Sequence, residues 1–178
     1  MTKPSVKYSE SEFKGLYIVE YFNLSDDRGV FVKPWVQSNV QDIFGNNFET
    51  YFSSSKKGVL RGLHYQIGNK AQKKYVTCLK GKIEDIALDL RENSSTYGQV
   101  FRKTLNEMDG RGLIIPEGFA HGIFAHEESI IVNFCDKVYS PGDEAGISPT
   151  SLASLKDLNI KILSDKDQSL PDFKDQKA

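Results

Sequence analysis

The stretch KKYVTCLKGKIEDIALDL, residues 73–90, decides the class of fold. It contains two runs rich in β-branched and aromatic residues, with a turn signal at Gly81 between them. In the second run, apolar side chains such as Ile86 share one face, whereas Asp85 and Asp89 lie on the other face with smaller apolar residues. The pattern predicts two neighbouring strands, one of which turns a partly polar face toward an enclosed space.

The same kind of run recurs along most of the chain, separated by turn signals rich in Gly, Pro, Asp and Asn. Further strands are expected at residues 29–36, 48–55, 99–106, 112–118, 121–126 and 129–139. Helical pattern is scarce and occurs only near residues 39–45 and 151–158. About eight short strands at near-regular spacing predict an all-β sandwich, barrel or jelly roll, and such folds often enclose a ligand cavity.

Composition limits the domain organisation and the partners. Residues 1–178 suffice for a single domain with a core, and residues from about 172 to 178 are expected to form a frayed tail. With 23 basic and 24 acidic residues, the net charge is -1, which favours neither nucleic acid nor a membrane as partner. Cys78 and Cys135 do not form a CxxC pair and are typical of buried thiols in a reducing compartment. A polar N-terminus and the lack of an apolar span favour a cytoplasmic protein.

A histidine and an arginine flank a glycine in LRGLHYQ, residues 60–66. In a regular strand Arg61 and His64 would point to opposite faces, unless Gly62 introduces a bulge that re-aims them. A solvated Arg61 and a structurally satisfied His64 explain this segment equally well, since one histidine is a weak signal.

A second histidine strengthens the interpretation as a cavity. His121 follows the turn Pro116-Glu117-Gly118 and precedes another glycine, so it is also expected where backbone segments approach closely. The chain has only three histidines, and a metal-binding HxH pair is interrupted because His64 is followed by Tyr65 and Gln66. The spacing of possible ligands therefore predicts no metal site.

Cationic side chains are placed where they could serve an anion. Lys74 opens an apolar strand, and together with Arg28 and Arg61 it would form a site for a diphosphate or an enolate oxygen. Asp167 reads as a surface charge by itself, but a carboxylate against His64 would raise the basicity of the imidazole and fix its tautomer.

Several of these segments together resemble one family, the dTDP-4-dehydrorhamnose 3,5-epimerases and related sugar epimerases. The resemblance rests on DDRGVF (26–31), GVLRGLHYQ (58–66), AQKKYVTCLKGKIEDIALDLR (71–91), SSTYGQ (94–99), LIIPEGFAHGI (113–123) and VYSPGDEAGI (138–147). It extends from about Tyr17 to Pro171. It implies a cupin-type jelly-roll β-barrel with a few short helices, a homodimer, and an isomerase that epimerises a nucleotide-diphosphate 4-keto sugar without metal or cofactor.

The resemblance also implies roles for individual residues. A dyad of His64 and Asp167 would remove the proton next to the C4 ketone. Arg61 and Lys74 would stabilise the resulting C4 enolate. The residues that match contacts to the diphosphate or the sugar are Arg28, His121, Glu144 and Lys166.

Three positions depart from the pattern of the family. The general acid of the family is a Tyr, and counting back from Tyr139-Ser140-Pro141 places Asn133 at that position. An amide does not protonate a carbanion at useful rates, although water held by Asn133 could reprotonate one centre. We therefore expect epimerisation at a single carbon, with C3 favoured over C5, and full 3,5-epimerisation remains the alternative.

The other two departures concern the nucleotide side. Lys33 replaces a Glu that usually follows the DxRG motif, and Glu49-Thr50-Tyr51 replaces Gln-Asp-Asn. The nucleotide is therefore open between dTDP, GDP and CDP. Tyr51 could stack on a base, but a buried tyrosine in a strand is the commoner explanation.

Two other functions remain open. An isomerase that moves the ketone from C4 to C3 also uses a cupin fold, but normally lacks the pair RGLH and PEGFAHG. A catalytically inactive protein that binds a sugar nucleotide is the other alternative, because the tyrosine is missing. The sugar itself and the pathway are not readable from the sequence, although cell-surface polysaccharide biosynthesis is usual for the family.

Overall fold

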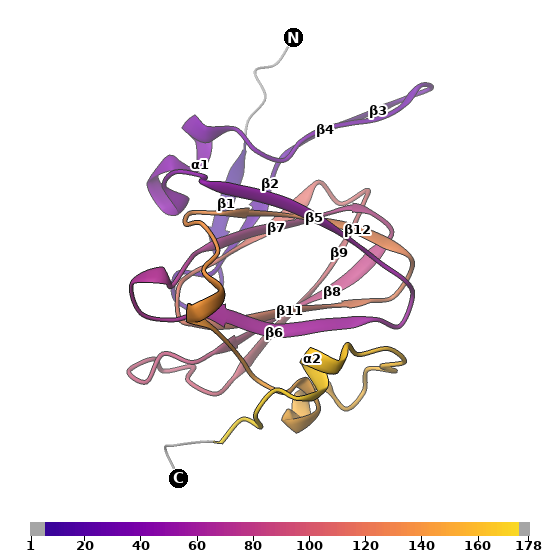
Figure 1. Cartoon of the computed structure of the whole chain (residues 1–178). Helices are drawn as coiled ribbons and strands as arrows, with labels where there is room; N and C mark the ends of the chain where they lie inside the picture. Colours follow the sequence, from indigo (N-terminus) through magenta and orange to yellow (C-terminus); the bar gives the residue numbers. More distant parts are fainter. Residues whose placement is uncertain (1–5, 175–178) are drawn as a thin grey trace.

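The structure is a computed structural model that describes residues 6–174. Two antiparallel sheets face each other, and a separate hairpin extends from them (Figure 1). Sheet 1 contains, in spatial order, β1 (Lys7–Glu10), β2 (Tyr17–Glu20), β10 (Arg111–Ile115), β7 (Lys74–Lys80), β12 (Ser129–Cys135) and β5 (Glu49–Ser55). Sheet 2 contains β13 (Glu144–Gly146), β6 (Leu60–Gln66), β11 (Phe119–Ala125), β8 (Lys82–Asp89) and β9 (Val100–Asn106). The hairpin consists of β3 (Phe22–Asp26) and β4 (Gly29–Lys33).

The connections make this arrangement a cupin-like jelly roll. From β5 to β8 the chain alternates between the two sheets, and every strand pair is antiparallel. The expected all-β jelly roll is therefore confirmed. The two sheets do not close into a continuous barrel, because among residues 6–174 no hydrogen-bonded ladder joins them.

Helices are few and short, as expected. They are α1 (Gln37–Phe44), α2 (Asp165–Gln168) and the 3-10 turns η1 (Gly68–Lys70), η2 (Pro141–Asp143), η3 (Pro149–Ser151) and η4 (Ala153–Leu155). The helix expected near residue 39 is α1, whereas the pattern at 151–158 forms only the two short turns η3 and η4. None of the helices in the described part of the chain has the length and apolar character needed to cross a membrane.

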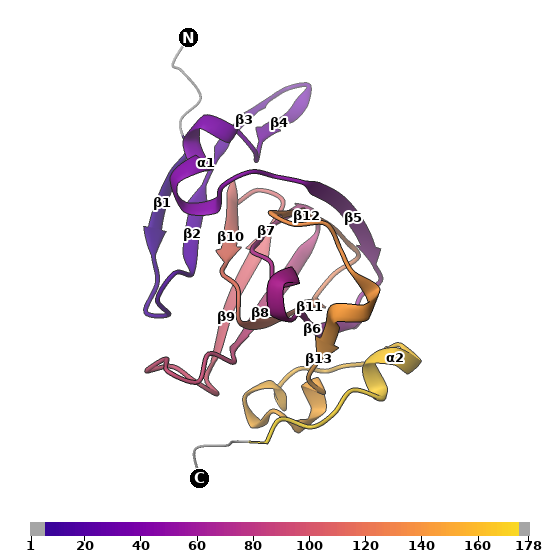
Figure 2. The same ribbon diagram turned by 60° about the vertical axis from the view of Figure 1, so that its left-hand side comes forward.

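The core explains why β8 alternates as it does. Its inner face places Ile83 and Ala87 between the sheets, against Val76 of β7 and other apolar residues. Its outer face packs Ile86 and Leu88 against the segment that contains η3 and η4. The C-terminal segment thus covers the outer face of sheet 2, below β6 in Figure 1 and again in Figure 2. Both faces of β8 are buried, and the polar face is the inner one, as predicted.

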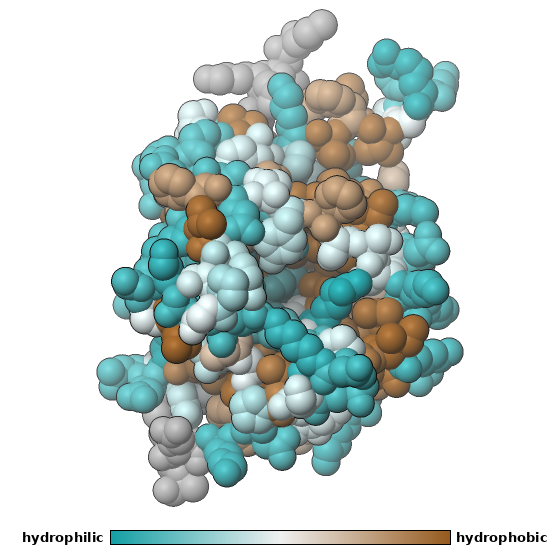
Figure 3. Space-filling model, viewed as in Figure 1, coloured by the Kyte–Doolittle hydropathy of each residue, from teal (hydrophilic) through white to brown (hydrophobic). Residues whose placement is uncertain are grey.

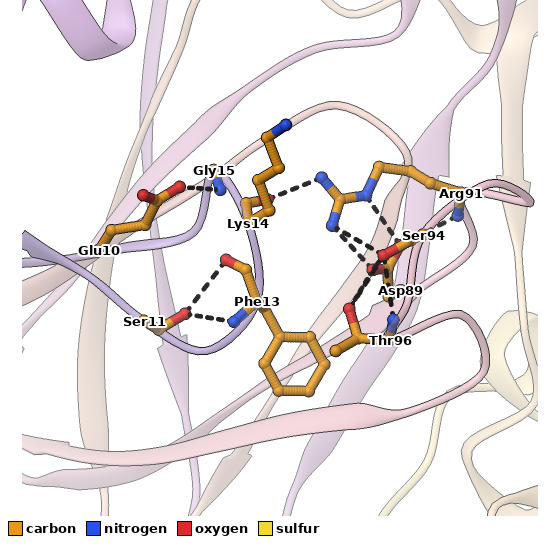
Figure 4. A network of polar contacts seen from close by, with 9 residues as sticks. All are labelled: Glu10, Ser11, Phe13, Lys14, Gly15, Asp89, Arg91, Ser94 and Thr96. Atoms are coloured by element: carbon orange, nitrogen blue, oxygen red, sulfur yellow. Dashed lines mark hydrogen bonds and ion pairs between the residues drawn. The ribbon is translucent and has the colours of Figure 1, made fainter.

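Asp89, at the end of β8, is fully buried and belongs to a saturated polar network (Figure 4). Its carboxylate accepts hydrogen bonds from Arg91 at 2.7 and 2.9 Å, from Ser94 at 2.6 Å and from Thr96 at 2.7 Å. Arg91 also donates to the carbonyl of Lys14, which ties the N-terminal loop to β8. We call Asp89, Arg91, Ser94 and Thr96 the Asp89 network.

Two smaller expectations concern the cysteines and the tail. Cys78 and Cys135 are both buried and free, as predicted.

The frayed tail was expected to begin near residue 172, but the backbone N–H of Phe173 donates to Ser151, and its ring lies 6.1 Å from that of Tyr97. Residue 173 is therefore docked on the body, and residues 175–178 lie outside the described residues.

Candidate active site

A cavity of about 480 Å³ lies between the two sheets. Its volume is in the range of small-ligand sites. Figure 3 shows the corresponding face of the molecule with a recess near its middle, bordered by hydrophilic side chains. The residues that line it include Glu49, Tyr51, Ser53, Arg61, His64, Tyr65, Gln66, Gln72, Lys74, His121, Ile131, Asn133, Tyr139, Glu144, Lys166 and Asp167.

His64 and Asp167 form a dyad on one wall of this cavity. Oδ1 of Asp167 lies 2.7 Å from Nε2 of His64, although the two residues are 103 positions apart in the chain. Asp167 sits in the short helix α2, and its backbone N–H donates to the N-cap residue Ser164. The carboxylate is buried, and its Oδ2 also accepts a weak hydrogen bond from the Gly62 N–H at 3.4 Å.

The contact with Asp167 assigns the tautomer of His64. A carboxylate only accepts, so Nε2 carries the proton and Nδ1 has a free lone pair. Within residues 6–174, Nδ1 is buried without a hydrogen bond, and Oε1 of Glu144 lies 3.5 Å away. Burial lowers the pKa of His64 below its ordinary value and outweighs the opposite effect of Asp167. The imidazole is therefore neutral near pH 7, and one of its nitrogens is available as a base.

Gly62 allows Arg61 and His64 to line the same cavity. The ladder between β6 and β11 shifts register near this point, so the regular alternation of side chains is interrupted. A Cβ on Gly62 would lie 2.7 Å from the carbonyl oxygen of His121, which leaves room only for glycine. Arg61 is anchored from the side by hydrogen bonds to Oγ of Ser55 and the carbonyl of Ser54, both at 2.9 Å.

Lys74 begins β7 and borders the cavity from sheet 1. Burial lowers the pKa of its ammonium group, and the charges of Cys135, Glu144 and Asp85 oppose this shift. Among residues 6–174 its Nζ has no hydrogen-bond partner. An ammonium group in such a place can stabilise a negative oxygen of a ligand.

His121 lies opposite His64 in the β6–β11 ladder. Its Nε2 is held by both oxygens of Asp85, at 3.0 and 3.1 Å, and Asp85 is fully buried. The polar inner face of β8 thus supports the second histidine of the cavity.

Glu144 is the centre of a cluster at the same cavity. Its Oε2 accepts from Nζ of Lys166 at 2.7 Å and from the hydroxyl of Tyr139 at 2.6 Å. Burial alone would raise the pKa of Glu144, but these two hydrogen bonds lower it. The carboxylate is therefore charged at neutral pH.

The wall formed by sheet 1 carries Glu49, Tyr51 and Asn133. Asn133 on β12 is directly paired with Tyr51 on β5, and both side chains line the cavity. Glu49 accepts a hydrogen bond from the backbone N–H of Tyr139 at 2.6 Å.

Two residues expected at the site lie elsewhere in this chain. Arg28 and Lys33 belong to the β3–β4 hairpin, which extends away from the two sheets (Figures 1 and 2). Arg28 keeps 87% of its side chain exposed and pairs with Asp26 at 2.6 Å. The anion site expected from Arg28, Arg61 and Lys74 is therefore wrong within one chain, because the hairpin carries Arg28 outward.

The sequence did not single out Tyr139, Gln66, Gln72 or Ser53, which also border the cavity. Gln66 and Ser53 follow the alternation of strands whose other members were identified, so the period of two could have indicated them. Within residues 6–174, no three or more His, Cys, Asp or Glu side chains are arranged so that they could hold a metal ion together.

The fold and this cavity define a class of protein, the cupin-like sugar-nucleotide epimerases, which are isomerases. The family model for dTDP-4-dehydrorhamnose 3,5-epimerase matches residues 10–175, so the chain belongs to that family. An epimerase of this name from Shigella flexneri is 38% identical over 168 residues, which cover 89% of this chain and 91% of the relative.

Solved structures of the family agree with the fold. The enzyme from Sulfolobus tokodaii superposes with a TM-score of 0.84 at 37% identity, over 94% of each chain. The enzyme from Bacillus anthracis, solved with TDP and PPi bound, superposes with a TM-score of 0.87 at 31% identity. That match covers 95% of this chain and 100% of the Bacillus chain.

Proposed function

We propose that this protein epimerises a nucleotide-diphosphate 4-keto sugar at one carbon next to the ketone, through a C4 enolate. One observation carries the proposal: the neutral imidazole of His64 has one nitrogen bound to Asp167, and its other nitrogen lacks a hydrogen bond. The same cavity holds cations for the oxygen that gains charge.

The proposed step begins at Nδ1 of His64. This nitrogen takes the proton from C3 or C5, and the electron pair of the broken C–H bond moves to form the enolate with charge on the C4 oxygen. Asp167 stabilises the imidazolium that results through the hydrogen bond that it accepts from Nε2. Lys74 and Arg61 stabilise the enolate oxygen.

The polar residues around the dyad suit the rest of the substrate. We assign His121, Glu144 and Lys166 to the sugar and diphosphate, and Glu49 to the side of the nucleotide. The favoured nucleotide is dTDP, because a Legionella pneumophila relative with 29% identity was solved with dTDP-4-keto-L-rhamnose. A cytoplasmic step in cell-surface polysaccharide biosynthesis would use such a compound.

Asn133 supports inversion of a single carbon. The amide is buried in the wall opposite to β6, where the resemblance places the tyrosine that serves as general acid. We propose C3 as the carbon inverted, with C5 as the alternative.

A homodimer is part of the proposal, because the β3–β4 hairpin exposes Leu24, Val30 and Phe31. Figure 3 shows hydrophobic side chains gathered along this hairpin. A two-stranded hairpin is marginal by itself and needs a surface to pack on. A second copy would supply that surface and would bring Arg28 and Lys33 toward the cavity of the other subunit. Sedimentation should give the mass of a dimer, and Phe31→Lys should shift it toward the monomer; a monomeric wild type contradicts this part.

The activity is tested with dTDP-4-keto-6-deoxyglucose in deuterium oxide, followed by NMR. We expect deuterium at one carbon with inversion, and a loss of about 1,000-fold or more in His64→Asn. A thermal-shift panel of dTDP, GDP, CDP and UDP identifies the nucleotide, because ligands of the native state raise Tm.

The outcome also separates the alternatives. Binding without any exchange in the wild type would identify a binding protein, and a 3-keto product would identify a ketoisomerase. Deuterium with efficient inversion at both carbons would establish full 3,5-epimerisation and contradict the single-carbon proposal.

A further inference from the structure

An epimerase needs a proton donor on the side of the carbon that faces away from the base. His64 lies on β6 of sheet 2, so the donor is expected on the opposite wall, which sheet 1 forms. Asn133 lies on that wall but its amide is far too weak an acid. A replacement donor must therefore be a nearby acidic group with its proton available.

Tyr51 occupies a suitable position. In the β5–β12 ladder it is the direct partner of Asn133, and directly paired residues have Cβ atoms about 5 Å apart on the same face. Both side chains line the cavity. The phenol is therefore displaced sideways from position 133 by one strand spacing, roughly 4.8 Å, along the same wall.

The hydroxyl of Tyr51 is protonated and uncommitted. Burial raises its pKa well above the ordinary value of 10.0, and the charges of Glu49 and Glu144 add to the shift. Among the residues that the structure describes, no side chain or backbone group forms a hydrogen bond with it. Tyr51 keeps 42% of its surface accessible, as a side chain that borders a cavity does.

The other tyrosines of the cavity are less suitable. The hydroxyl of Tyr139 donates its proton to Glu144 at 2.6 Å, so that proton is engaged. Tyr65 lies on β6, the strand that carries the base. Only Tyr51 combines the opposite wall with a free hydroxyl among the tyrosines that line the cavity.

We propose that Tyr51 is the catalytic proton donor that completes the inversion from the face opposite to His64. The proposal rests on the proposed function. The C–H bond breaks toward His64, and a new C–H bond forms with the proton of the Tyr51 hydroxyl. The imidazolium then loses its proton to solvent and the tyrosinate regains one, so the enzyme is restored without any change in oxidation state.

The sequence pattern is consistent with this assignment. By the resemblance to the family, the position of its catalytic Tyr reads Asn133 here, and a position that carries Asn in the family reads Tyr51. The two residue types have thus changed places across one pair of neighbouring strands.

The test compares Tyr51→Phe with Tyr8→Phe, which removes the same hydroxyl from an exposed tyrosine on β1, outside the cavity. With dTDP-4-keto-6-deoxyglucose in deuterium oxide, we expect Tyr51→Phe to lose inversion by about 100-fold or more. It should retain His64-dependent deuterium exchange with retained configuration and the thermal shift given by dTDP. Tyr8→Phe should invert at the rate of the wild type.

A second pair of variants tests the position of the donor. Tyr51→Asn should be as inactive in inversion as Tyr51→Phe, and adding Asn133→Tyr should restore inversion, because the phenol returns to the same wall. Inversion at the wild-type rate in Tyr51→Phe would overturn the proposal, as would loss of the dTDP shift, which would make Tyr51 a binding residue. If the wild type shows no deuterium exchange, the proposed function is overturned together with the role of Tyr51. If the wild type exchanges deuterium but Tyr51→Phe still inverts normally, only the role of Tyr51 is overturned.

Discussion

Among the buried carboxylates of residues 6–174, Asp89 and Asp167 have opposite surroundings. Asp89 is surrounded by donors, since Arg91, Ser94 and Thr96 all bond to it. Asp167 has one strong partner, the ring of His64, and one weak backbone contact. The other nitrogen of that ring is buried without a hydrogen bond.

The different surroundings of Asp89 and Asp167 suit different roles: Asp89 contributes to stability, and Asp167 supports the chemistry at His64. A saturated network satisfies every group that burial has removed from water, so it stabilises one conformation. A buried imidazole nitrogen without a partner is costly for folding, and such costs are concentrated at functional sites. The pKa values follow the same division: burial would raise that of Asp89, but its hydrogen bonds lower it to about 2, whereas burial lowers that of His64.

The largest expected effect is the loss of activity when Asp167, the partner of His64, is changed. Asp167→Asn should lower the rate of epimerisation about 1,000-fold, because a neutral amide does not stabilise the imidazolium. The thermal unfolding midpoint should change little, since the amide oxygen still accepts from Nε2. Rates by NMR and Tm by calorimetry check both parts. A variant that loses stability and keeps its activity would reverse the assignment.

The matching change in the Asp89 network should lower stability and leave the activity per folded molecule unchanged. Asp89→Asn breaks a buried ion pair with Arg91 and should cost about 3 kcal/mol in the free energy of unfolding. For a chain of this length, that corresponds to a fall in Tm of roughly 6–12 °C. Urea unfolding measures the loss, and activity per folded molecule serves as the control. Full stability with lost activity would show that the network belongs to the site.

A single hydrogen bond of the network gives a smaller effect. Thr96→Val removes the hydroxyl that donates to Asp89 at 2.7 Å and keeps the shape of the side chain. We expect a loss of about 1.5 kcal/mol, because the acceptor is charged. Thr104→Val on the more exposed strand β9 is the control, and an equal loss in both variants would contradict a special role of the network.

The smallest expected effect is a difference between the pH ranges in which His64 and Asp89 titrate. The folded pKa of His64 lies below its ordinary value of 6.5, so its contribution to stability is complete above pH 6.5 and declines as pH falls below that value. The neutral base itself is lost only as pH falls through the lowered folded pKa. Asp89 contributes stability above its ordinary pKa of 3.8, and loses it only as pH falls toward about 2. The loss of activity should therefore be displaced to a pH below the 6.5 of an ordinary histidine, while the protein remains folded. A profile of kcat/KM against pH, with circular dichroism on the same samples, tests this order. Unfolding before the loss of activity would contradict it.

Much of this molecule was determined locally by the sequence. The alternation in residues 82–90 predicted the strand and its polar inner face, because the side chains of a strand alternate with a period of two whatever lies around it. Glycines next to His64 and His121 indicated close backbone approach, and Gly62 does lie against the backbone of residues 121 and 122. The sequence left open whether Gly62 re-aims its neighbours, since a bulge depends on the register of the partner strand.

Only the tertiary structure decided which residues meet. The contact between His64 and Asp167 spans 103 positions, and nothing in the local pattern of Asp167 distinguishes it from a surface charge. Pairing of β5 with β12 placed Tyr51 beside Asn133, and the direction of the β3–β4 hairpin removed Arg28 from the cavity of its own chain. Local periodicity fixes the face on which a side chain lies, but the partners across a cavity depend on how distant strands pair, which is set by the packing of the whole chain.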